Sequence, residues 1–156
     1  LNSRGAGELC VLVGFALIVV GADYVQRHAF SLTPVVASLS YALLVTNVLY
    51  INQFPDRQAD AAAGKRHWVV RLEPEQARWG YVVLAVAANA WLIGAVLAGL
   101  LPALALVALV AAIPSARAAA DLFSYAARPR ALVPAIRRTI AAALLHSLLL
   151  SCALFL

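Results

Sequence analysis

Charged residues are scarce in this chain, and their scarcity argues against a soluble protein. Of its 156 residues, only 12% are Asp, Glu, Lys or Arg, while 64% are hydrophobic. A soluble domain carries about 25% charged residues. The composition therefore indicates an integral membrane protein.

Long apolar runs take up most of the chain. Five segments are long and apolar enough to cross a hydrocarbon core, which requires about 20 residues. The sequence therefore predicts an all-α, polytopic transmembrane bundle, with residues 1–156 forming a single domain. The five expected spans are approximately Leu9–Tyr24, Pro34–Ile51, Trp79–Ala98, Leu101–Ala120 and Arg138–Phe155.

Basic residues gather on one side of this predicted bundle. Eleven of the twelve Lys and Arg residues fall before the first span, between the second and third, or around the connection from the fourth to the fifth. Arg27 alone lies on the other side. The positive-inside rule places the 53–78 connection in the cytoplasm, so we expect a multi-pass protein of the cytoplasmic membrane. This topology explains the net charge of +5 without nucleic acid.

Cysteine is rare and methionine is absent. Cys10 and Cys152 fall near opposite ends of the expected bundle, whereas a disulfide needs Cα atoms within about 7 Å. We therefore expect both thiols to be unpaired. Because the chain starts at Leu1 and contains no Met, we expect that it does not begin where translation began. The opening residues also lack the charged region and cleavage site of a signal peptide.

The most informative polar segment follows the second apolar run. Asn52, Asp56 and Asp60 are spaced i, i+4, i+8, so on a helix they project from one face within about 80° of arc. Two carboxylates at the mouth of an apolar bundle favour a hard cation such as Mg²⁺, which takes one or two carboxylates and completes its shell with phosphate and water. Lys65 and Arg66 follow closely and suit a phosphate group. An ordinary polar juxtamembrane loop is the alternative that the spacing leaves open.

A longer pattern in this region resembles a known family. It is similar to the second aspartate-rich motif of the UbiA-type intramembrane prenyltransferases, in the branch acting on 1,4-dihydroxy-2-naphthoate in menaquinone synthesis. The opening Arg4–Glu8 and the later Gly21–Gln26 also resemble that branch, and beyond Leu72 the likeness is only general. The pattern reads Asn52-x-x-Pro55-Asp56-x-x-x-Asp60-x-x-x-Gly64-Lys65-Arg66-x-x-Val69-Val70-Arg71-Leu72.

The resemblance implies a nine-helix bundle in which two aspartate-rich motifs hold Mg²⁺ against the diphosphate of a polyprenyl donor. The first motif, Asn-Asp-x-x-Asp, occurs nowhere in this sequence. We therefore expect the five spans to correspond to the last five of nine, and the N-terminal helices of the same enzyme to be missing partners. The chain alone should then lack one wall of its site.

The resemblance also assigns roles to individual residues. It makes Asp56 and Asp60 the catalytic metal ligands, and it implies a polyprenyl diphosphate and an aromatic acceptor as substrates. His67 and Trp68 depart from the Thr-Leu that the branch usually shows, which puts substrate identity in doubt. The residues expected to bind the diphosphate are Asn52, Lys65, Arg66 and Arg71.

Other readings stay open. The fold could serve an acceptor of the homogentisate, hydroxybenzoate, chlorophyllide or glycerol-phosphate type. A transporter or cation channel with Asp56 and Asp60 as its ion site is a different class, although transporter sites usually lie near the midplane on broken helices. A non-catalytic membrane subunit is a third.

Three polar residues in the later spans are expected to make contacts within the bundle and not to bind substrate. Arg117 and Asp121 are spaced i, i+4 and are expected to pair with each other. His146 lies in the middle of the fifth span, where we expect a neutral imidazole bonded to a neighbouring helix.

Overall fold

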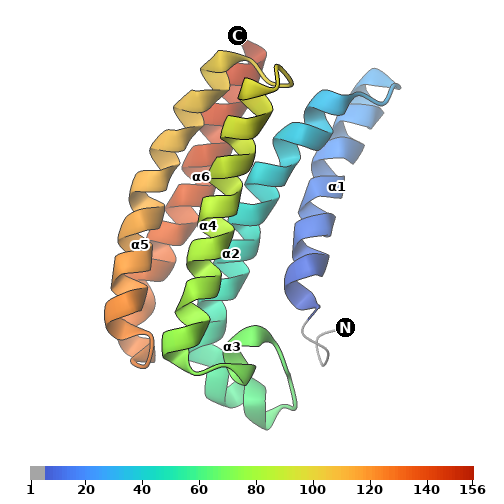
Figure 1. Cartoon of the computed structure of the whole chain (residues 1–156). Coiled ribbons are helices and arrows are strands. Elements are labelled where there is room, and N and C mark those ends of the chain that lie inside the picture. Colours follow the sequence, from blue (N-terminus) through green and yellow to red (C-terminus); the bar gives the residue numbers. More distant parts are fainter. Residues whose placement is uncertain (1–5) are drawn as a thin grey trace.

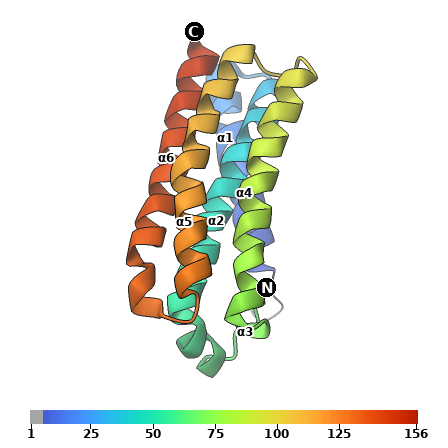
Figure 2. The ribbon, with the colours of Figure 1, turned by 60° about the vertical axis from the view of Figure 1, so that its left-hand side comes forward.

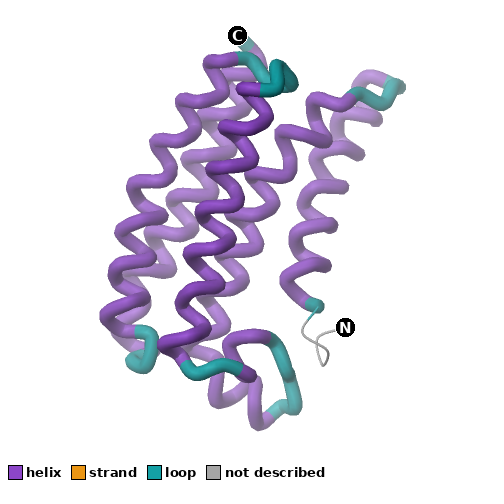
Figure 3. Tube along the Cα trace, in the orientation of Figure 1, coloured by secondary structure: helices purple, strands orange, loops and turns teal. Residues whose placement is uncertain are grey.

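Helices make up nearly all of the structure, a computed structural model that describes residues 6–156 (Figure 1). Figure 3 shows that short loops connect them, and no strand occurs within residues 6–156. The all-α prediction is confirmed. In chain order the elements are α1 (Gly7–Arg27), α2 (Leu32–Ala62), α3 (Trp68–Arg71), α4 (Pro74–Leu97), the 3₁₀ helix η2 (Ala103–Ala111), α5 (Ala112–Tyr125), the 3₁₀ helix η3 (Pro129–Leu132) and α6 (Val133–Phe155).

The five predicted spans each coincide with a helical segment long and apolar enough to cross a membrane. The fourth combines η2 with α5, and the fifth combines η3 with α6. The polytopic bundle is thus confirmed for the described residues. The helical segments are Gly7–Arg27, Leu32–Ala62, Pro74–Leu97, Ala103–Tyr125 and Pro129–Phe155.

Helix α2 extends well beyond Ile51, where the predicted apolar span ends. Its 31 residues correspond to about 46 Å at about 1.5 Å per residue, whereas the hydrocarbon core of a bilayer is about 30 Å thick. The polar stretch from Asn52 onward therefore projects past the apolar part of the helix. Pro55 lies inside α2 and has no N–H to bond the Ile51 carbonyl, yet the helix continues through it.

The predicted 53–78 connection is correspondingly shorter in the structure. Its first ten residues belong to α2, and from Pro74 onward it belongs to α4, so the true connection is residues 63–73, which include α3. Gly64 follows the end of α2 with a φ of 74°. The Gly64 N–H bonds to the Ala61 carbonyl and the Lys65 N–H bonds to the Asp60 carbonyl, which is the Schellman arrangement that glycine favours.

Helix α2 lies at the centre of the bundle, with α1 on one side and α4 and α6 on the other (Figures 1 and 2). Twelve residues of α2 are buried, whereas α1 has no buried residue. Because α1 contacts mainly α2, its other faces are exposed in this chain. Near the polar end, Tyr50 and Phe54 of α2 join a core cluster with residues of α4, α5 and α6.

Buried hydrogen bonds join α2, α4 and α6. The Asn47 side-chain amide donates to the Tyr81 carbonyl at 3.1 Å, and the Tyr81 hydroxyl lies 2.9 Å from the Thr139 hydroxyl. The Ser40 hydroxyl lies 3.0 Å from Nε2 of His146. His146 is therefore bonded to a neighbouring helix, as expected, and such bonds help helices associate in lipid.

The expected pairing of Arg117 with Asp121 is wrong. Asp121 on α5 instead accepts a hydrogen bond from Arg138 on α6, and Arg117 is exposed. Arg117 and Asp121 are one turn apart on α5, close enough for their side chains to pair. The close approach of α6 supplies a competing partner that the spacing along α5 could not reveal.

Candidate functional site

The predicted metal ligands lie on the last turns of α2, beyond its apolar part. Asn52, Asp56 and Asp60 all belong to this one helix, so their i, i+4, i+8 spacing places them on one face. Asp56 is exposed, whereas Asp60 is largely covered, with 13% of its side chain exposed. The structure thus gives the two carboxylates different surroundings.

Both oxygens of the Asp60 carboxylate are engaged by residues just past the end of α2. Lys65 Nζ donates to Oδ1 at 2.5 Å, and Nε2 of the buried His67 lies 2.9 Å from Oδ2. The hydrogen bond from the Lys65 ammonium lowers the pKa of the Asp60 carboxyl, His67 adds to this effect, and burial opposes it. Asp60 is therefore held as a carboxylate next to a fixed cation.

Arg57 of α2 forms hydrogen bonds that hold the connection between α2 and α4 against the end of α2. Its Nε donates to the Val69 carbonyl at 2.9 Å and its Nη2 to the Leu72 carbonyl at 3.0 Å. Nη2 also lies 3.7 Å from a carboxylate oxygen of Glu73. Arg57 thereby positions α3 beside the end of α2, which brings His67 against Asp60.

The remaining predicted diphosphate ligands are not gathered at Asp60. Asn52 donates to the Val48 carbonyl of its own helix at 2.7 Å. Arg66 and Arg71 are both exposed, and neither makes an ion pair within residues 6–156. Of the four residues expected to bind phosphate, the structure joins Lys65 alone to an aspartate of the motif.

Sequence reasoning missed Arg57 and His67. Arg57 was visible as a basic residue inside the aspartate motif, and His67 as a departure from the pattern of the branch. Their contacts depend on the connection folding back onto α2, which no local spacing predicts. Both are now placed among the residues that shape the site.

The carboxylates of the described residues can hold Mg²⁺ only together with oxygen atoms from a ligand such as diphosphate. No group of three or more His, Cys, Asp or Glu residues capable of holding a metal occurs in the described part of the chain. Mg²⁺ commonly uses one or two protein carboxylates together with substrate phosphates and water. Asp56 and Asp60 match that requirement by number and spacing, so the residues present fit the ion alongside a diphosphate.

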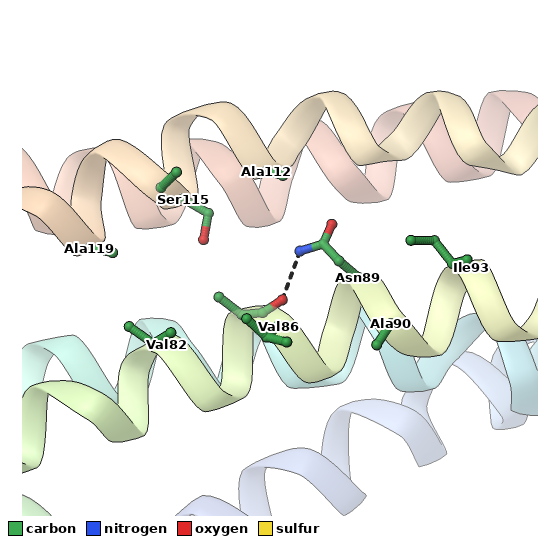
Figure 4. Close-up of a pocket in the computed structure, with 10 residues that line it drawn as sticks. Val82, Val86, Asn89, Ala90, Ile93, Ala112, Ser115 and Ala119 are labelled. Carbon is green, nitrogen blue, oxygen red and sulfur yellow. Dashed lines mark hydrogen bonds between the residues drawn. The ribbon is translucent and has the colours of Figure 1, made fainter.

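Several cavities border α4, and two of them bear on the site. The larger, about 510 Å³, is an open groove between α4 and α5 (Figure 4). Its walls are mainly small apolar side chains, and the Asn89 amide within it donates to the Ala85 carbonyl of its own helix. Neither Asp56 nor Asp60 lines this groove. The smaller cavity, about 280 Å³, is lined by residues of α1, α2 and α4 and by the α3 segment, and neither aspartate lines it.

Comparison with known proteins identifies the family. The profile of the UbiA prenyltransferase family matches residues 1–132. The chain is 37% identical over 94 residues to the 1,4-dihydroxy-2-naphthoate octaprenyltransferase of Haemophilus influenzae, an alignment that covers 59% of this chain and 30% of the relative. It is 39% identical over 75 residues to the Escherichia coli protein of the same name, covering 47% of this chain and 24% of the relative.

The chain therefore matches less than a third of the length of either curated relative. No solved structure gives a significant match. The family profile nevertheless covers most of the chain, including the whole of α2 and the aspartates at its polar end. This chain belongs to the UbiA prenyltransferase family.

Proposed function

We propose that this chain is the C-terminal part of a Mg²⁺-dependent membrane prenyltransferase. The enzyme would transfer a polyprenyl group from its diphosphate to an aromatic quinone precursor such as 1,4-dihydroxy-2-naphthoate. The observation that carries the proposal is the pair Asp56 and Asp60 at the polar end of α2, with Lys65 held against Asp60. The names of the two relatives support this choice of acceptor.

The reaction requires diphosphate to leave with the electron pair of its bond to the prenyl carbon. Mg²⁺, when bound, would neutralise part of the negative charge that builds on the leaving oxygens. Lys65 would supply a further positive charge there, and Arg66 and Arg71 could join it from the surface. The electron-rich ring then forms a bond to the prenyl carbon, and the ring carbon that reacted releases the group it carried, a proton or a carboxylate as CO₂, so that the ring becomes aromatic again. Asp56 and Asp60 thus hold the cation, and the basic residues bind the phosphate oxygens.

The proposal includes helices that precede this chain in the intact enzyme. Helix α1 has no buried residue, so a large apolar surface beside the site is available for such helices to cover. We propose that these helices carry the other aspartate-rich motif, and that the 63–73 connection faces the cytoplasm. The bilayer would supply the environment for the polyprenyl chain.

The test measures prenyl transfer in membranes that contain this chain together with the N-terminal helices of the Escherichia coli relative. Product formation from a polyprenyl diphosphate and 1,4-dihydroxy-2-naphthoate is followed by mass spectrometry. Chelation should abolish transfer and added Mg²⁺ should restore it. Asp56→Asn and Asp60→Asn should each lower turnover by about a hundredfold or more, while the chain still inserts into the membrane.

Asp23→Asn is the matched control. Asp23 lies at the other end of the bundle on α1, 3.7 Å from Arg27, so its loss of charge should leave turnover within about twofold, since surface ion pairs contribute little. Residues 1–156 alone should show no transfer. Near-normal turnover in both Asp56→Asn and Asp60→Asn would contradict the assigned role.

A further inference from the structure

Among residues 6–156, one charged side chain lines the smaller cavity beside α3. Tyr50 of α2, Trp68 of α3 and Val83 of α4 contribute to its largely apolar wall, and Glu8 of α1 is the acidic residue that lines it. Its volume of about 280 Å³ lies at the small end of ligand pockets, which hold about 300–1,000 Å³. A flat aromatic molecule suits this space better than a long polyprenyl chain. We call it the Glu8 cavity.

Glu8 and its hydrogen-bond partner leave two buried acceptor atoms unused. Gln53 Nε2 donates to Glu8 Oε1 at 3.0 Å. Glu8 Oε2 and Gln53 Oε1 are buried, and no residue between 6 and 156 donates to either. Gln53 itself is only 7% exposed. Buried acceptors normally find a donor, so this pair is suited to a ligand that brings hydroxyl groups.

The Glu8 cavity lies close to the candidate diphosphate site. Gln53 precedes Asp60 by seven residues on α2, so the two side chains share a face to within about 20° and are about 10 Å apart along the axis. Trp68 of the cavity wall directly follows His67, which contacts Asp60. An aromatic ring in the cavity would therefore be placed next to a prenyl group whose diphosphate is bound at Asp60.

One wall of the cavity is fixed by close packing. The Tyr50 hydroxyl donates to the Ala77 carbonyl at 2.8 Å. A Cβ atom at Gly80 would lie only 2.2 Å from the Tyr50 hydroxyl oxygen, so the absence of a side chain at Gly80 lets Tyr50 lie against α4. Tyr50 is thereby held as a rigid aromatic surface beside Glu8.

We propose that the Glu8 cavity is the binding site of the aromatic acceptor, and that Glu8, positioned by the hydrogen bond from Gln53, receives its ring hydroxyl groups. This inference rests on the proposed function and specifies its substrate class as an aromatic ring bearing hydroxyl donors. The Glu8 carboxylate accepts a hydrogen bond from a ring hydroxyl and thereby selects hydroxylated rings over their ethers. Tyr50 and Trp68 supply the apolar surface against which the ring lies.

The test compares two ligands that differ in hydrogen-bond donation. 1,4-Dihydroxy-2-naphthoate and its 1,4-dimethoxy analogue are titrated by calorimetry, without oxygen, into nanodiscs containing the chain and the N-terminal helices described above. The wild type should bind the dihydroxy ligand more tightly. Glu8→Gln replaces a charged acceptor with a neutral amide of the same size, so it should reduce this preference by at least about tenfold.

The matched control is Glu75→Gln, because Glu75 is exposed on the first turn of α4 and lies outside the cavity. It should leave the preference unchanged. The ratio of the two affinities separates hydrogen bonding from the larger size of the methoxy groups, since both proteins meet the same pair of ligands. The ligand comparison in the wild type needs no variant, so it stands even if Glu8→Gln folds poorly.

Equal affinity of the wild type for both ligands, an unchanged preference in Glu8→Gln, or no binding of the dihydroxy ligand would each overturn the inference. If Mg²⁺-dependent transfer persists in those cases, the assignment of the cavity fails while the proposed function stands. If transfer is absent but binding depends on Glu8, the proposed function fails instead.

Discussion

His67 reaches back across the turn that ends α2 and places Nε2 2.9 Å from Oδ2 of Asp60. His67 is almost completely buried, with 2% exposed, whereas Lys65 approaches the other carboxylate oxygen from a half-exposed position. The carboxylate is therefore fixed in orientation from two sides before any ligand arrives. A cation bound at Asp60 must share or replace one of these contacts, while Asp56 stays accessible.

Replacing Asp60 should loosen the connection as well as the site. Asp60→Asn removes the charge that attracts Lys65 and weakens the bond to His67. We expect amide hydrogen exchange in residues 64–72 to accelerate by about tenfold or more, because hydrogen bonds to charged groups contribute more than neutral ones. Asp56→Asn is the control, since Asp56 is exposed, and it should leave exchange in this segment unchanged. Equal acceleration in both variants would contradict the structure.

Arg57 should be the main attachment of α3 to α2. Arg57→Ala removes its hydrogen bonds to the Val69 and Leu72 carbonyls. Limited proteolysis should then cleave the 63–73 connection at least about tenfold faster, because cleavage follows the population of the opened segment. Arg66→Ala removes an exposed arginine of the same connection and should behave like the wild type. Similar cleavage rates for Arg57→Ala and the wild type would show that other contacts hold the segment.

Two glycines of α4 should respond differently to a methyl group. Gly80→Ala places a Cβ against the Tyr50 ring and should destabilise the protein by about 1–3 kcal/mol through overpacking. At Gly94, no atom other than those of its chain neighbours and its own helix backbone lies within 4 Å of the position that a methyl group would take, so Gly94→Ala should be neutral or stabilise the helix by up to about 1 kcal/mol. Thermal unfolding in detergent measures both changes. A lower melting temperature for Gly94→Ala than for Gly80→Ala would be inconsistent with this packing.

The two cysteines provide a test of topology. Both are free and exposed, as expected, and they lie at the start of α1 and near the end of α6, at opposite ends of the bundle (Figure 1). In Cys152→Ser, a membrane-impermeant maleimide should label Cys10 from the cytoplasmic side. In Cys10→Ser, it should label Cys152 from the other side. Labelling of both from the same face would refute the five-span arrangement.

Hydropathy was sufficient to predict the number of spans, but it could not show how far α2 continues past its apolar part. The apolar span ends near Ile51 because Asn52 begins a polar stretch, whereas the helix ends at Ala62. Backbone hydrogen bonds, however, continue along a helix whatever its side chains face, and this stretch is rich in alanine, a strong helix former. The loss of one bond at Pro55 was too small to end the helix.

The parts of the candidate site that lie on one helix could be predicted from the sequence. The parts that depend on the 63–73 connection folding back onto α2 could not. The alignment of Asp56 with Asp60 followed from their spacing alone. The contacts of Arg57 and His67 required the connection to return to α2, and the bond from Arg138 to Asp121 required α6 to approach α5. Such contacts between distant segments have no periodic signal in the sequence.

Because α2 continues through Pro55 without a break, the number of residues along the helix sets both the depth and the direction of the Asp56 and Asp60 carboxylates. One continuous helix carries both the buried apolar segment at the centre of the bundle and the segment that carries Asp56 and Asp60. One residue inserted between Thr46 and Pro55 would lift both aspartates by about 1.5 Å and turn them by about 100°. An insertion or deletion in this part of α2 therefore changes the depth of the two carboxylates in the bilayer and, at the same time, the direction in which they point.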